Sequence, residues 1–123
     1  MALIENLTLR RFRTRDPNRD AETDQQRMDA IRAAVTGAIE SATRERAGLK
    51  RRVDDYYAVV SQIVDSGDYG HRSEKLEREA RDAELQGRLG LARLARIDAE
   101  LDRYRRVLAT VDELRVAAPS SAA

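Results

Sequence analysis

The residue types that most often carry out catalysis are scarce in this sequence. Its 123 residues include no cysteine and a single histidine, His71. His71 follows Gly70, so a solvated loop histidine is a better interpretation than a general base or a metal ligand. No nucleophile elbow, phosphate-binding glycine loop or metal-spaced set of histidines and cysteines is present. These absences predict a protein that is not an enzyme and that has no cofactor.

Carboxylates are numerous enough to bind metal ions, so their spacing decides the interpretation. Helical bundles hold two metal ions with inward-facing glutamates and Glu-x-x-His motifs, and the sequence lacks this pattern. Asp54, Asp55 and the four acids between Glu77 and Glu84 lie mostly off the apolar positions, where they alternate with arginine. We therefore expect a solvated acidic face and no metal site.

Basic residues gather in two stretches, 44–52 and 88–96, which face each other if the chain folds back on itself. The two stretches hold eight basic residues and one acid, Glu45. We call this group the basic waist: Arg44, Arg46, Lys50, Arg51, Arg52, Arg88, Arg93 and Arg96. It could bind nucleic acid phosphates, although it lacks interleaved aromatic residues and a recognisable reading helix. Residues 54–84 are acidic, so they could instead meet the waist of a second subunit in a staggered antiparallel dimer.

The N-terminal head, residues 1–20, is a second candidate for binding. It carries Leu7, Leu9 and Phe12 among arginines, and it could dock on a partner, pack on the hairpin or cross to a second subunit. It is too short and too polar for a signal-peptide core or a membrane span. Together with the absence of cysteine, this favours a cytoplasmic protein with no membrane partner.

Two long segments of helical periodicity must position these groups. In the first, apolar residues alternate at gaps of three and four from Met28 to Ile63, with one four-residue stutter through Ile31, Val35 and Ile39. In the second, the alternation is unbroken from Leu76 to Val111. No stretch has the period of two that a strand requires. The sequence thus predicts an all-α protein whose two apolar stripes form one seam.

The stretch between the segments, residues 66–72, contains two glycines that can end a helix and turn the chain. Ser73 is a candidate N-cap for the second helix, and Asp16-Pro17 or Thr23 for the first. Because the connection is short, we predict an antiparallel coiled-coil hairpin over residues 21–116, followed by a disordered tail, 117–123.

If the turn centres near Tyr69, facing residues have numbers that sum to about 138. This register places Val53 and Tyr57 opposite Ala83 and Gly87, so that bulky residues meet small ones. Glycine costs about 1 kcal/mol in a helix interior, so Gly87 and Gly90 predict a close approach between the helices.

A second apolar stripe lies off this seam and comprises Val59, Val64, Leu85, Leu89, Leu91, Val107 and Leu114. One seam between two helices buries few large side chains against the cost of ordering them, so the second stripe predicts self-association. A dimeric four-helix bundle is the simplest form.

The favoured function is therefore a non-enzymatic structural or interaction protein, a homo-oligomer of adaptor or stalk type that binds a partner protein. Nucleic acid binding through the basic waist is one alternative. In outline the hairpin also resembles the helical-hairpin stalk and escort proteins of bacterial export systems. That resemblance implies a third possibility, an export chaperone that holds a partner's helix.

Overall fold

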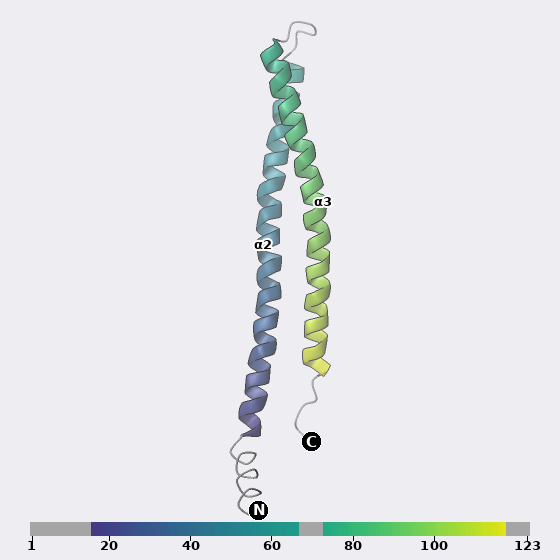
Figure 1. The fold of residues 1–123 in the computed structure, drawn as a ribbon. Helices are drawn as coiled ribbons and strands as arrows, with labels where there is room; N and C mark the ends of the chain where they lie inside the picture. Colours follow the sequence, from purple (N-terminus) through teal and green to yellow (C-terminus); the bar gives the residue numbers. More distant parts are fainter. Residues whose placement is uncertain (1–15, 67–72, 118–123) are drawn as a thin grey trace, which may run out of the picture.

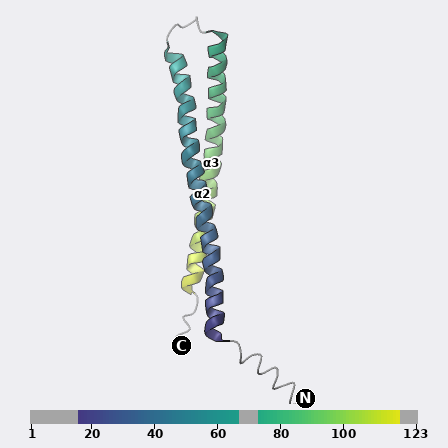
Figure 2. The ribbon, with the colours of Figure 1, turned by 90° about the vertical axis from the view of Figure 1, so that its left-hand side faces the viewer.

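The computed structural model describes residues 16–66 and 73–117 of the chain. These residues form two helices, α2 (Pro17–Asp65) and α3 (Glu74–Ala117), and contain no strand. The helices run antiparallel, as the chain colours in Figure 1 show. They overlap near the turn in Figure 1 and in the opposite half in Figure 2, which is turned by 90°, so the pair is supercoiled. The predicted all-α helical hairpin is confirmed.

The start of α2 follows the first of the two predicted capping patterns. The side chain of Asp16 accepts a hydrogen bond of 3.0 Å from the backbone N–H of Asn18, and Pro17 occupies the first helical position. The other candidate cap, Thr23, lies inside the helix, where its hydroxyl donates to the carbonyl of Arg19.

The start of α3 is also capped as predicted. The hydroxyl of Ser73 accepts a hydrogen bond of 3.3 Å from the backbone N–H of Leu76. Glu74 and Glu77 lie in the first turn, where carboxylates complement the helix dipole. The predicted turn residues 67–72, with His71 among them, lie outside the described residues.

The two helices differ in length, so their open ends are not flush. At 1.5 Å per residue, the 49 residues of α2 span about 74 Å and the 44 residues of α3 about 66 Å. The N-terminal part of α2 extends beyond the end of α3 in Figure 1. Residues 17–27 are all exposed, and the last ion pair between the helices joins Asp29 to Arg115.

The core is a single thin seam between α2 and α3. Its buried apolar residues are Val53, Ile63, Ala83, Leu94, Ile97, Leu101 and Val111. On α3 every predicted seam position from Leu76 to Val111 is buried or half-buried. The unbroken periodicity expected for the second helix is therefore confirmed.

On α2 the predicted stutter is wrong. Ile31 is 49% exposed, whereas Arg32 is half-buried and takes the seam position. With Arg32 in the seam, the gaps of four and three continue from Met28 to Ile63 without a break. Arg32 fits there because its guanidinium leaves the seam to reach Asp112, at 2.8 Å.

The helices approach closely at Gly87 and Gly90, as the sequence predicts. A Cβ atom on Gly90 would overlap Cγ2 of Val53, and one on Gly87 would lie 2.9 Å from Cε2 of Tyr57. The principle of bulky residues against small ones is confirmed, with Val53 against Gly90 and Tyr57 against Gly87. These contacts join residues whose numbers sum to 143 and 144 and not to 138.

Candidate interaction surfaces

One side of the hairpin is defined by arginines that stand in the seam and reach out of it. On α2, Nε of Arg32 donates to Asp112 at 2.8 Å, and Nε of Arg46 donates to Asp98 at 2.5 Å. The second pair lies two heptads from the first along both helices. Each arginine fills an apolar position with its hydrocarbon stem and leaves its charge beside the seam.

A third pair repeats this arrangement with the helices exchanged. Arg115 on α3 lies one heptad beyond the seam residue Leu108, and its guanidinium is 2.7 Å from Asp29 of α2. We call this side of the hairpin the charged side, defined by Asp29, Arg32, Arg46, Asp98, Asp112 and Arg115. It runs from the middle of the rod to the end away from the turn, and we call this part of the rod the open half.

The cross-helix pairs shift the pKa values of their members. The hydrogen bond from Arg46 is the main cause that lowers the pKa of Asp98 below its ordinary value of 3.8, and Arg32 lowers the pKa of Asp112 in the same way. Conversely, the hydrogen bonds to Asp98 and Asp112 raise the pKa of the two arginines. All four side chains remain partly exposed, so water screens each pair and its net contribution to stability is small.

The structure places the basic waist in the middle of the rod, but pairs half of its charges within the chain. Arg93 makes two hydrogen bonds to Glu45, at 3.0 and 3.1 Å. Arg46 pairs with Asp98, Lys50 with Asp54 at 3.1 Å, and Arg88 with Glu84 at 3.9 Å.

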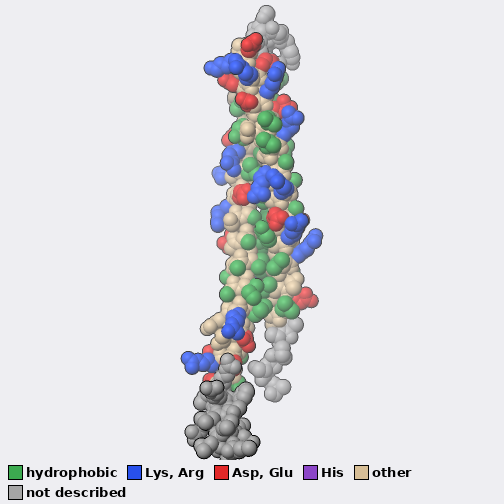
Figure 3. All heavy atoms as spheres, viewed as in Figure 1, with side chains coloured by type: hydrophobic (Ala, Val, Ile, Leu, Met, Phe, Trp, Pro, Cys, Tyr) green, Lys and Arg blue, Asp and Glu red, His purple; other side chains and the backbone are tan. Residues whose placement is uncertain are grey.

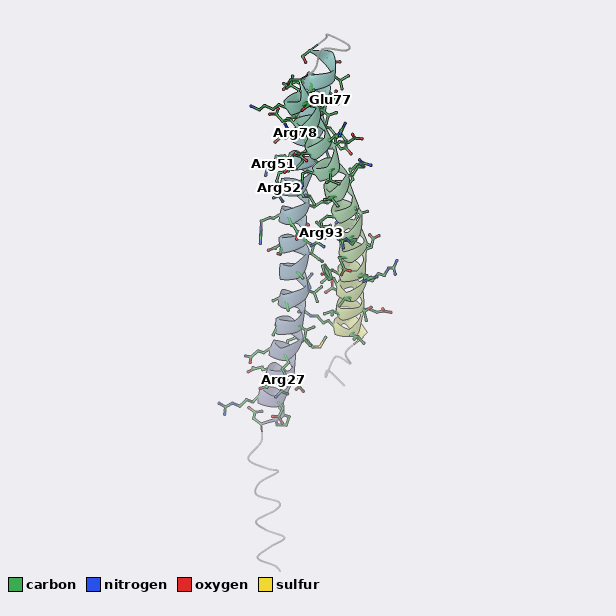
Figure 4. All side chains as sticks on the ribbon, turned by 45° about the horizontal axis from the view of Figure 1, so that its top comes forward. Arg27, Arg51, Arg52, Glu77, Arg78 and Arg93 are labelled. Atoms are coloured by element: carbon green, nitrogen blue, oxygen red, sulfur yellow. The ribbon has the colours of Figure 1, made fainter. Side chains whose placement is uncertain are left out.

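The other four waist residues, Arg44, Arg51, Arg52 and Arg96, are exposed and make no ion pair within the described part of the chain. Figure 4 shows Arg51 and Arg52 on α2 and Arg93 on α3. The free positive charge is therefore smaller than the sequence suggests.

Apolar side chains remain uncovered along the rod. The large exposed ones are Ile31, Val59, Val64, Leu85, Leu89, Leu91, Val107, Leu114 and Val116. They include all seven residues of the predicted second stripe, which is thus exposed in the isolated hairpin.

Opposite the charged side, the open half carries a different surface. Ile31 and Val107 each lie one residue before a seam residue. Glu45 and Arg93 lie at equivalent positions, two heptads from Ile31 on α2 and from Val107 on α3. Because Glu45 and Arg93 meet across the groove at 2.9 Å, the same register brings Ile31 and Val107 to the same side and level. Figure 3 shows hydrophobic side chains gathered where the helices meet in the open half of the rod.

Between these two pairs the groove is hollow. The hollow has a volume of about 210 Å³ and is lined by Ala38, Ser41, Ala42 and Glu45 from α2 and by Arg93, Ile97, Glu100 and Tyr104 from α3. Its α2 wall consists largely of small side chains, which leave room for another helix to come close. We call the surface formed by Ile31, Val107 and this hollow the apolar side.

Sequence reasoning missed both sides of the open half. It assigned Ile31 to the seam and considered Arg46 only as part of the basic waist, because only apolar residues were expected in the seam. The signal was nevertheless present, since Arg32 and Arg46 are two heptads apart and so are Asp98 and Asp112. A pattern that allows arginine in the seam opposite aspartate would have found the register.

The described residues leave one candidate surface untested and allow two searches. The head residues Leu7, Leu9 and Phe12 fall outside the described ranges. Among the residues that are described, no group of histidines and carboxylates could hold a metal ion. Neither α2 nor α3 has an apolar stretch long enough to cross a bilayer.

The open half of the hairpin therefore presents two different sides of one seam, the charged side and the apolar side with its hollow. Comparison of the chain with protein-family models, with curated proteins and with solved structures gives no match.

Proposed function

We propose that this protein is a non-enzymatic interaction protein, a helical hairpin that self-associates and presents its remaining surface to a partner protein. The observation that carries this proposal is the second apolar stripe, whose side chains are 40% or more exposed along both helices. Large exposed apolar areas on soluble proteins mark sites of association.

The exposed area of the chain supports the same proposal. In the described ranges only seven hydrophobic side chains are buried, so most of the surface of both helices stays exposed. A standard interface buries about 800 Å² on each partner, so the hairpin can supply such an interface and keep surface for another protein. A dimeric four-helix bundle is the simplest assembly that covers a seam of this kind.

Nucleic acid binding has weaker support. Four of the eight waist residues pair with carboxylates of the chain, and Arg93 and Arg46 each join the two helices. Phosphate binding would have to use the four arginines that lack such a pair.

Sedimentation equilibrium of the full chain at micromolar concentration tests the proposal. We expect a mass of twice 13.9 kDa or a higher multiple. A compact, stable monomer would contradict it. Retardation of nucleic acid at low salt, with affinity that falls steeply as salt is raised, would instead favour the basic waist as the functional surface.

A further inference from the structure

The two sides of the open half differ in what they can accept. On the charged side, the pairs Arg32–Asp112 and Arg46–Asp98 close the groove with hydrogen bonds of 2.8 and 2.5 Å. On the apolar side, Ile31 and Val107 are 49% and 48% exposed, and the groove beside them is hollow. A second pair of helices can therefore bury apolar surface on one side and not on the other.

The apolar side is also complementary to itself. If two copies are related by a two-fold axis parallel to the rod, α2 of one copy faces α3 of the other. Two residues that lie across the groove from each other within one copy then also meet between the two copies, at the same level. Glu45 would then meet Arg93 of a second copy, and Arg93 would meet its Glu45, which gives a square of alternating charges. Ile31 would meet the second copy's Val107 in the same way, which gives a cluster of four apolar side chains.

The outer rows of the same side match as well. Leu89 is 55% exposed on α3, and Gly48 lies near its level on α2. A Cβ atom on Gly48 would meet nothing within 4 Å, so the hairpin itself gives no packing reason for a glycine there. In the two-fold arrangement Leu89 of one copy lies over Gly48 of the other, a bulky residue against a small one.

We propose that the apolar side binds the apolar side of a second copy, with the rods parallel and both turns at the same end. This inference rests on the proposed self-association and specifies the surface that mediates it. The occupant is a second copy because the apolar cluster, the charge square and the pairing of Leu89 with Gly48 all arise from one symmetry operation. The small side chains of the hollow let the two pairs of helices come close enough for these contacts.

The first test compares two double variants by sedimentation equilibrium. Ile31→Glu with Val107→Glu places charge on the apolar side, and we expect it to raise the dimer Kd by about a hundredfold or more. Val64→Glu with Leu91→Glu is the matched control, because these residues are similarly exposed and belong to the same apolar stripe but lie on the other side of the seam. The control should leave the Kd unchanged, and circular dichroism should show both variants to be helical.

The second test uses cross-linking, which is clean because the chain has no native cysteine. Chains with Gly48→Cys are mixed with chains carrying Leu89→Cys, allowed to exchange subunits and then oxidised. We expect a disulfide-linked dimer in the mixture and none in either variant alone, because the parallel arrangement brings position 48 to position 89 of the other copy.

The outcomes separate this inference from the proposed function. A monomeric wild-type chain would contradict both. A wild-type dimer that the control variant breaks, and that the Ile31→Glu with Val107→Glu variant does not, would overturn the choice of surface and leave self-association standing. A dimer that depends on Ile31 and Val107 but gives no mixed disulfide would overturn the parallel arrangement.

Discussion

At the scale of single residues, the glycines of the hairpin have opposite roles. Gly90 lies in the seam, where Val53 occupies the space that a side chain would need. Gly37 lies on the exposed face of α2, where nothing comes within 4 Å of the position of a Cβ atom. The same substitution should therefore have opposite effects at these two sites.

We expect Gly90→Ala to lower the free energy of unfolding by about 1–3 kcal/mol, because Val53 must move to admit a methyl group. Gly37→Ala is the matched control, and it should raise the free energy of unfolding by about 0.5–1 kcal/mol, since alanine loses less backbone entropy in a helix. Urea denaturation of the two variants measures both values. Stabilisation by Gly90→Ala would show that the helices do not approach at this point.

Sequence reasoning reached the correct side chains here and one of the two contacts, because Tyr57 lies against Gly87 as expected whereas Val53 lies against Gly90. Apolar periodicity locates Val53 and Gly90 in the seam, because it depends only on the chain's own helical repeat. A single sum of residue numbers does not describe both sides of the seam, so it does not identify the residue that Val53 contacts. The sum of 138 holds for Glu45 and Arg93, on the other side of the seam from Tyr57 and Gly87.

At the scale of the helices, the repeated arginine–aspartate pairs fix how α2 lies against α3. A seam of apolar residues alone tolerates a shift by one heptad, because the repeat looks the same after the shift. Moving α3 by one heptad would leave Arg32 and Arg46 without their aspartates. The sequence predicted the helices but not these arginine–aspartate pairs, because an arginine in an apolar stripe looks like a break in the pattern until its partner on the other helix is known.

These pairs also predict a dependence of stability on pH. The pKa values of Asp98 and Asp112 are lower in the folded chain than their ordinary value, so their contribution is complete above about pH 4 and is lost as the pH falls through the lowered values. Asp98→Asn with Asp112→Asn should therefore be less stable than the wild type at neutral pH. The difference should shrink as the pH is lowered from neutral toward 2.

Thermal unfolding followed by circular dichroism at both pH values measures this difference. Asp102→Asn is the control, because Asp102 is largely exposed and lies 4.0 Å from Arg105 on its own helix. It should change stability little at either pH. A difference between the double variant and the wild type that stays constant down to pH 2 would show that these carboxylates do not act through their charge.

At the scale of the whole molecule, the hairpin is a long rod with a thin core. Even Ile97, the most buried of the core residues, keeps 2% of its surface exposed. Self-association of such a rod, as proposed above, would add to its stability, and this contribution would depend on concentration by mass action.

We expect the melting temperature of the wild-type chain to rise by about 2–4 °C for each tenfold increase in concentration. The melting temperature of the variant with Ile31→Glu and Val107→Glu should not change with protein concentration, because this variant no longer forms the dimer. Circular dichroism melts between micromolar and submillimolar concentration measure both. A wild-type melting temperature that does not change with concentration would mean that the rod is stable alone.

The uneven length of the two helices has a consequence for local order. In the described part of the chain, residues 17–27 of α2 are exposed and extend past the end of α3, so α3 gives their backbone hydrogen bonds no support. A lone helical segment of this length is marginal in water, and its cap at Asp16, the pair of Arg27 with Asp24 and its continuity with the rod favour the helix. The end of α2 can therefore unwind and rewind while the seam stays intact, and because the rest of α2 already supplies the helix nucleus, the helicity of this tip depends on propagation alone.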